Sequence, residues 1–181
     1  VFAAPIPAEE AATTAFISSG TWSLLGIDLP EPILTPEARK AGFSNEGSVS
    51  GGVNFLQNIT GLWFLQQLQA EWQRRGDCWS YQQLVEMAEQ QPCASVIDVD
   101  DAAFSSPASM EQAIADYCQR HQLAVPASAG EMCYCVINSL AQRYAKGIRQ
   151  LDSLLPEPVR KICIIGGGSR NTLLNRLTAQ A

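Results

Sequence analysis

Basic side chains are scarce in this sequence. Its 181 residues include 12 Lys and Arg against 18 Asp and Glu, which gives a formal net charge of -6, and no three basic residues are consecutive. Nucleic acids and anionic membrane surfaces attract proteins through clusters of positive charge. We therefore expect neither a nucleic acid nor a membrane as a partner.

Long apolar runs and metal-binding patterns are missing as well. No segment approaches the roughly 20 apolar residues of a membrane-spanning helix, and the segment from Val1 lacks the basic start of a signal peptide. The six cysteines include no C-x-x-C pair, and His121 is the only histidine. Structural zinc sites combine closely spaced Cys and His. We predict no metal site, and we expect a cytoplasmic protein with reduced thiols.

The sequence does contain enough apolar material for a core, with 46% hydrophobic and 17% charged residues. Strand-like and helix-like segments are mixed along the chain, which favours an α/β fold in a single domain over residues 1–181. The sequence has no initiator Met, and Ala181 falls inside a helical pattern. We therefore interpret it as a fragment truncated at both ends.

The most informative stretch lies near the carboxyl end. The apolar run 162–165 predicts a strand covered on both faces. Gly166, Gly167 and Gly168 follow, and Asn171 or a serine before it can cap the helix that comes next. A helix amino end behind a bare glycine loop favours a nucleotide, because unpaired N–H groups and the helix dipole face it. The same glycines also fit a plain tight turn, so the loop alone does not decide.

A hairpin is predicted near the amino end. The segments 14–18 and 22–27 read as two short strands with a bend at Gly20. Three hydroxyls surround that glycine, those of Ser18, Ser19 and Thr21. Hydroxyls and turn N–H groups at such a tip can wrap phosphate oxygens. An ordinary polar turn has the same composition.

The spacing of apolar residues predicts a helix over about 55–74. Asn58 and Gln66 are eight positions apart within it, a little over two turns, so we expect both amides on one side, facing either a cleft or solvent.

Further elements are predicted from local signals. We expect an edge strand within 43–49, a short strand over 95–98, and a helix that starts with Pro107 at its first position. Capping boxes at Ser80 and Ser128 should open two more helices, the second of them running to about residue 153.

Three segments together resemble one family. They are S-S-G-T-W at 18–22, N-I-x-G-L-W-x-L-Q at 58–66 and G-G-G-x-x-N-x-L-L-N at 166–175. The sequence resembles the carboxyl-terminal domain of the FGGY carbohydrate kinases over essentially its whole length. The middle segment is most like the members that phosphorylate L-rhamnulose. The resemblance implies an actin-like, ribonuclease-H-like ATPase fold, a mixed sheet with helices, in which two domains close over ATP and a sugar.

The resemblance also implies roles for individual residues. Gly20 and Thr21 would form a phosphate loop, and Gly167, with Gly166 and Gly168 beside it, would lie against the adenosine of ATP. Gln66 and Asn171 would be further nucleotide contacts. Asn58 would contact the sugar. ATP and Mg²⁺ are the implied cofactors, and the reaction would make L-rhamnulose 1-phosphate.

Other implied features lie outside this sequence or are less direct. In the family the general base is an Asp in a Gly-His-Asp motif of the preceding segment, so no catalytic residue is assigned here. The expected partner is the amino-terminal kinase domain. The fragment alone should be inactive. A disulfide between Cys118 and Cys135 is implied by some family members.

Alternative functions remain at this point. The resemblance also fits a xylulose, fuculose or glycerol kinase, or a non-catalytic sensor with an actin-like fold. A dehydrogenase of the G-x-G-x-x-G type is disfavoured because position 171 is Asn, and a P-loop kinase because no Gly-Lys-Ser/Thr follows the glycines.

Overall fold

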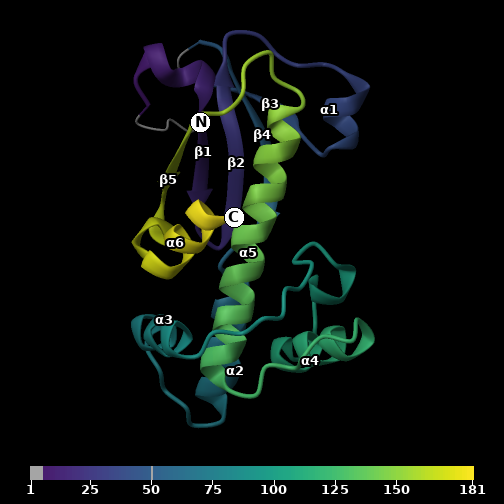
Figure 1. Ribbon diagram of the computed structural model, residues 1–181, viewed down its shortest axis with the longest axis vertical. Coiled ribbons are helices and arrows are strands. Elements are labelled where there is room, and N and C mark those ends of the chain that lie inside the picture. Colours follow the sequence, from purple (N-terminus) through teal and green to yellow (C-terminus); the bar gives the residue numbers. More distant parts are fainter. Residues whose placement is uncertain (1–5, 50) are drawn as a thin grey trace. The chain divides into compact units, whose positions relative to one another are not determined.

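The computed structural model describes residues 6–49 and 51–181 (Figure 1). The chain divides into two compact units. The first takes in Val1–Ile59 and Tyr144–Arg170, and the second takes in Thr60–Arg143 and Asn171–Ala181. The fold is mixed α/β, as predicted, while the single domain over 1–181 stays a prediction.

A five-stranded mixed sheet forms the centre of the first unit, in the order β3-β4-β2-β1-β5. Strands β1 and β2 pair antiparallel, as do β3 and β4, whereas β1 and β5 pair parallel. Their bounds are Thr14–Ser19 for β1, Trp22–Leu29 for β2, Ser44–Gly47 for β3, Val53–Thr60 for β4 and Lys161–Ile165 for β5. The predicted hairpin and the predicted edge strand within 43–49 are both confirmed.

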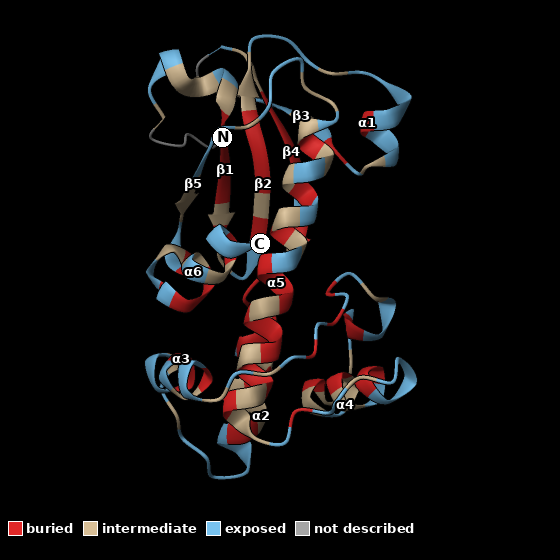
Figure 2. Ribbon diagram, in the orientation of Figure 1, coloured by how far each residue is buried: buried red, intermediate tan, exposed pale blue. Residues whose placement is uncertain are grey.

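Short helical segments surround this sheet. The 3-10 helix η1 (Ala8–Thr13) precedes β1, and α1 (Pro36–Lys40) lies between β2 and β3. The side chain of Thr35 caps α1 by accepting a hydrogen bond from the Ala38 N–H at 3.2 Å. Figure 2 shows buried residues along β1 and β2 and along much of the long helix α5 (Ala129–Asp152).

Strands β2 and β4 approach closely at Gly26. A Cβ atom built on Gly26 would lie 2.6 Å from the Cβ of Leu56 and nearer still to the carbonyl oxygen of Phe55. Real side chains do not pack at such distances, so glycine is required by the spacing of the two strands rather than by backbone angles.

The prediction of a strand covered on both faces at 162–165 is wrong. Strand β5 stands at the end of the sheet order, its residues are exposed or half-buried, and Ile162 is 41% exposed. An apolar, β-branched run fits any extended segment with one packed neighbour. How many neighbours it has depends on distant parts of the chain, which composition does not reveal.

The prediction of one helix over 55–74 is also wrong. Residues up to Thr60 form β4, and helix α2 (Trp63–Arg74) begins after Gly61 and Leu62. Short apolar runs are compatible with either strand or helix. Pairing decides here, because β3 lies beside β4 with Ser44 opposite Leu56.

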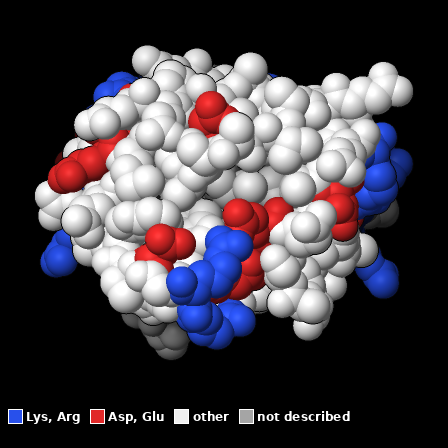
Figure 3. Space-filling model, turned by 90° about the horizontal axis from the view of Figure 1, so that it is seen from below, with Lys and Arg blue, Asp and Glu red and all other residues white. Residues whose placement is uncertain are grey.

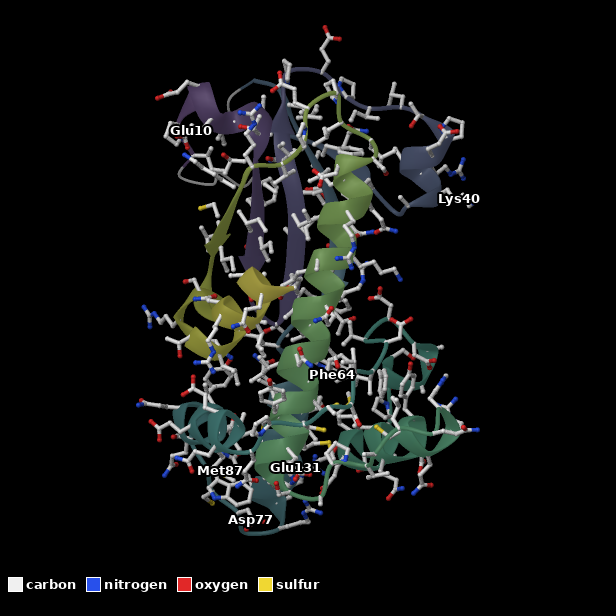
Figure 4. The ribbon with its side chains drawn as sticks, viewed as in Figure 1. Glu10, Lys40, Phe64, Asp77, Met87 and Glu131 are labelled. Atoms are coloured by element: carbon white, nitrogen blue, oxygen red, sulfur yellow. The ribbon has the colours of Figure 1, made fainter. Side chains whose placement is uncertain are left out.

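The second unit is helical. Besides α2 it contains α3 (Tyr81–Gln90), the 3-10 helix η2 (Ala102–Phe104), α4 (Met110–Arg120), the first part of α5 and α6 (Thr172–Gln180). Phe64, labelled in Figure 4, is fully buried and packs edge-on against Phe104 at 5.2 Å between ring centroids. Phe104 in turn contacts Tyr117 at 5.3 Å. These aromatic rings tie α2, η2 and α4 together.

Both predicted capping serines cap their helices, but only one of the two predicted capping boxes is complete. Ser80 accepts a hydrogen bond from the Gln83 N–H, and the Gln83 side chain accepts one from the Ser80 N–H, so this capping box is complete. Ser128 accepts from the Glu131 N–H at 3.2 Å, but the Glu131 carboxylate accepts from the Ala127 N–H instead.

One predicted strand is not formed, and one predicted helix begins later than expected. Residues 95–98 make no strand, because side chains take their backbone N–H groups: Ser139 accepts from Ile97 at 2.9 Å, and the Tyr117 hydroxyl accepts from Asp98 at 3.1 Å. Pro107 does not begin α4. The helix starts at Met110, since the Ser109 hydroxyl caps it by accepting from the Gln112 N–H.

Among the described residues, no helix has the length and apolar character that crossing a membrane requires.

Candidate nucleotide-binding site

The glycine loop and the hairpin tip lie beside each other in the first unit. Because β1 and β5 are parallel, their carboxyl ends meet at one edge of the sheet, where Ser18 stands opposite Ile165. A Cβ atom built on Gly166 would lie only 2.6 Å from the carbonyl oxygen of Ser19. Gly166 also has φ +83°, a conformation that other residues rarely adopt. Both the space and the backbone angle therefore require glycine at 166.

Gly167 differs from its neighbour. It is exposed, and a Cβ atom built there would meet nothing within 4 Å. The chain then forms a short 3-10 turn, η3 (Gly167–Arg170), in which the Ser169 N–H and hydroxyl both donate to the Gly166 carbonyl at 3.2 and 2.7 Å. Gly168 is buried. The loop thus presents bare backbone to open space at one position, 167.

Not all of the hydroxyls at the hairpin tip are accessible to solvent. The Gly20 N–H donates to the Trp22 carbonyl at 3.0 Å, which closes the bend. Thr21 is exposed and Ser18 is half-buried, but Ser19 is only 1% exposed. The prediction that three hydroxyls surround the tip holds for two of them, since the Ser19 side chain lies in the interior against Tyr144.

A buried group of hydroxyls beneath the tip was missed by the sequence reasoning. Tyr144 of α5 is fully buried, and its hydroxyl is hydrogen-bonded to that of Ser23 at 2.6 Å and to that of Ser19 at 3.4 Å. Burial raises the pKa of Tyr144, while the two serine hydroxyls act in the opposite direction. The one signal available in the sequence was a serine at an inward position of β2.

Asn171 has a structural task. Its side-chain oxygen accepts from the Leu174 N–H at 2.9 Å, which caps α6, and its side-chain amide donates to the Tyr81 hydroxyl at 2.9 Å. It is 1% exposed. Asn171 therefore shapes the start of α6, and a nucleotide contact made by this side chain stays a prediction.

Asn58 and Gln66 do not lie on one helix. Asn58 is exposed on β4 in the first unit, and Gln66 is exposed on α2 in the second. The expectation that they share one side of a helix is wrong, because Gly61 and Leu62 separate a strand from a helix there. Their individual roles stay predictions.

Charge around the loop is modest. Arg170 ends η3, and Lys161 at the start of β5 is paired with Glu10 at 2.6 Å. Figure 3 shows basic and acidic side chains intermingled on the face that it draws. Within the described residues, no group of three or more His, Cys, Asp or Glu side chains is placed to hold a metal ion.

The cysteines are free thiols in the structure. Burial raises the pKa of the Cys135 thiol, and the nearby thiols of Cys93, which is hydrogen-bonded to it, and Cys118 raise it further. Burial also raises the pKa of Cys118 and, to about 12, that of Cys133. Cys118 and Cys135 are thus buried neighbours, and the disulfide between them stays a prediction.

The fold is that of sugar kinases with the actin-like ATPase architecture. The chain superimposes on the crystal structure of xylulose kinase from Rhodospirillum rubrum with a TM-score of 0.64 and 12% identity, over 93% of this chain and 33% of that one. Xylulose kinase from Bifidobacterium adolescentis gives a TM-score of 0.58 and 16% identity, over 93% and 32%.

Sequence comparison defines the family. The model of the carboxyl-terminal domain of the FGGY family of carbohydrate kinases matches residues 15–181, and the chain belongs to this family. It is 43% identical to the rhamnulokinase of Bacteroides thetaiotaomicron over 168 residues, 92% of this chain and 34% of that protein. It is 41% identical to the rhamnulokinase of Pectobacterium carotovorum over 180 residues, 99% of this chain and 35% of that protein. The chain thus spans about a third of the length of these relatives.

Proposed function

We propose that this chain is the nucleotide-binding part of a kinase that transfers the γ-phosphoryl group of ATP to the 1-hydroxyl of L-rhamnulose. The observation that carries the proposal is the contact between Gly166 and the carbonyl of Ser19, which brings the glycine loop against the hairpin tip at one edge of the sheet. A nucleotide that lies across this edge would have its adenosine at the bare backbone of the glycine loop and its phosphates at the hydrogen-bond donors of the hairpin turn. The similarity to two rhamnulokinases supports the choice of sugar.

Each predicted site residue has a place in this proposal. The open backbone at Gly167 receives the adenosine, with the turn held by Gly166 and Gly168. Gly20 and Thr21 receive the phosphates. The Gly20 N–H closes the bend by donating to the Trp22 carbonyl, so the donor assigned to the phosphates is the hydroxyl of Thr21. Two further residues complete the proposal: Gln66 is assigned to the nucleotide and Asn58 to the sugar. Asn171 contributes by fixing the start of α6.

Phosphoryl transfer depends on positioning and charge neutralisation more than on covalent chemistry. When bound, Mg²⁺ would neutralise the phosphates, and it commonly takes most of its ligands from phosphate and water. We assign the general base to an amino-terminal domain of the whole kinase. That domain would also bind most of the sugar, and the enzyme would work in the cytoplasm.

The test uses the whole kinase that contains this chain. Calorimetry with MgATP should show saturable binding, and a panel of L-rhamnulose, D-xylulose, L-fuculose and glycerol should give the highest kcat/KM for L-rhamnulose, with phosphate on its first carbon by NMR. Failure to bind MgATP would refute the nucleotide site.

The same assay separates the alternatives. A higher kcat/KM for D-xylulose would favour another sugar kinase, an assignment that at present rests on fold similarity at 12% and 16% identity. Binding of ATP and sugar without any turnover would indicate a sensor.

A further inference from the structure

Tyr144 joins both strands of the hairpin directly below its tip. Ser19 is the last residue of β1, Ser23 is the second residue of β2, and the two are paired across the ladder. Gly20 and Thr21 are part of the short connection between them. The Tyr144 hydroxyl reaches Ser23 at 2.6 Å and Ser19 at 3.4 Å, over 121 and 125 positions of sequence. One atom of α5 therefore contacts both sides of the predicted phosphate loop.

These three hydroxyls are sealed from solvent. Tyr144 and Ser23 are 0% exposed and Ser19 is 1% exposed. A buried hydroxyl that loses its partner is costly, because water cannot replace the bond. Burial raises the pKa of Tyr144, so the phenol stays protonated and able to donate at neutral pH. The bonds therefore hold the tip in one arrangement instead of allowing it to rock against α5.

Ser19 also connects this group to the glycine loop. Its carbonyl oxygen is the atom that a Cβ on Gly166 would strike at 2.6 Å. A shift of Ser19 would thus disturb both the hairpin tip and the turn at Gly166. The positions of both halves of the proposed nucleotide site therefore depend on Ser19. The side chain of Ser19 is in turn hydrogen-bonded to the hydroxyl of Tyr144.

We propose that Tyr144 is a positioning residue for phosphoryl transfer, whose hydroxyl fixes the Gly20–Thr21 tip against the polyphosphate of ATP. This inference rests on the proposed function. Tyr144 itself is buried and touches neither substrate. Small displacements of groups that orient reactants reduce rates strongly, so the effect should appear in catalysis with ATP more than in folding.

The experiment compares three variants of the whole kinase. Tyr144→Phe removes one oxygen and keeps the ring, and we expect kcat/KM for ATP to fall by about tenfold or more, with the KM for sugar unchanged. Ser23→Ala should cause a similar fall. The double variant should be no worse than either single one, because the two hydroxyls act through one bond.

Tyr117→Phe is the matched control. It too removes a tyrosine hydroxyl that has a hydrogen-bond partner, here the Asp98 N–H at 3.1 Å. Tyr117 belongs to the second unit, whereas the hairpin belongs to the first. It should lower the melting temperature and leave kcat/KM for ATP within about twofold of wild type.

Each outcome has one meaning. If Tyr144→Phe keeps the wild-type kcat/KM for ATP, or loses activity only in proportion to folded protein as Tyr117→Phe does, Tyr144 is an ordinary core residue and the inference is wrong. If Tyr144→Phe does not fold, Ser23→Ala decides by the same criterion. If the wild-type kinase itself does not bind MgATP, it is the proposed function that fails.

Discussion

Gly166 and Ser19 are packed so closely that the loop and the hairpin act as one surface. The carbonyl oxygen of Ser19 occupies the place that a side chain on Gly166 would need, at 2.6 Å from the ideal Cβ position. Gly167, one position later, faces open space. Adjacent glycines therefore have different tasks, since one allows the chain to turn and the other leaves room above the backbone.

Gly166→Ala should destabilise the first unit. The positive φ of +83° alone costs about 1–2 kcal/mol for a residue with a Cβ atom, and the clash with Ser19 adds to it. Gly167→Ala, the matched control, should change the free energy of unfolding by less than about 1 kcal/mol. Urea denaturation of the two variants measures the difference. Equal stability of both variants would show that the turn relaxes easily.

Gly167→Val should weaken MgATP binding without unfolding the protein. A branched side chain would fill the open space above the backbone, where we place the adenosine. We expect the Kd by calorimetry to rise about tenfold or more, the equivalent of about 1.4 kcal/mol. Gly47→Val is the control, because Gly47 also has nothing within 4 Å but lies in edge strand β3. An unchanged Kd in Gly167→Val would remove Gly167 from the site.

Asn58→Ala and Gln66→Ala should affect different substrates. Both side chains are exposed, so neither substitution should alter stability by more than about 0.5 kcal/mol. Asn58→Ala should raise the KM for sugar more than that for ATP, and Gln66→Ala should do the reverse. Steady-state kinetics with each substrate varied in turn gives both constants. The opposite pattern would exchange the two assignments.

Asn171→Ala should destabilise α6 by about 1 kcal/mol, because it removes the cap on the Leu174 N–H. Asn171→Asp keeps the capping oxygen and loses only the donor to Tyr81, so it should retain most of the stability. Thermal unfolding compares the two variants. If ATP affinity falls equally in both while Asn171→Asp stays stable, the amide contacts the nucleotide directly.

Thiol labelling should follow burial. At pH 8 a thiol whose pKa is raised to about 12 is present as thiolate in only about one part in ten thousand. Iodoacetamide should therefore modify the exposed Cys78 first and should reach Cys133 only after denaturation. Peptide mass spectrometry resolves the sites.

A linked Cys118–Cys135 peptide in a non-reduced digest would establish the predicted disulfide.

The sequence predicted local features well and long-range ones poorly. The bend at Gly20 and the cap at Ser80 depend on residues within a few positions of each other, and both are formed as expected. The burial of β5 and the strand at Phe55 depend on pairing with distant segments. The bond between Tyr144 and Ser23 spans 121 positions, and no periodicity or motif encodes such a distance.

The crowding at Gly26 has a practical consequence for engineering this protein. Every other amino acid would bring a Cβ atom to within 2.6 Å of Leu56, so we expect a saturation library at this codon to be dominated by destabilised variants. Replacements at Asn58, which is exposed on β4, should be tolerated far better than replacements at Gly26.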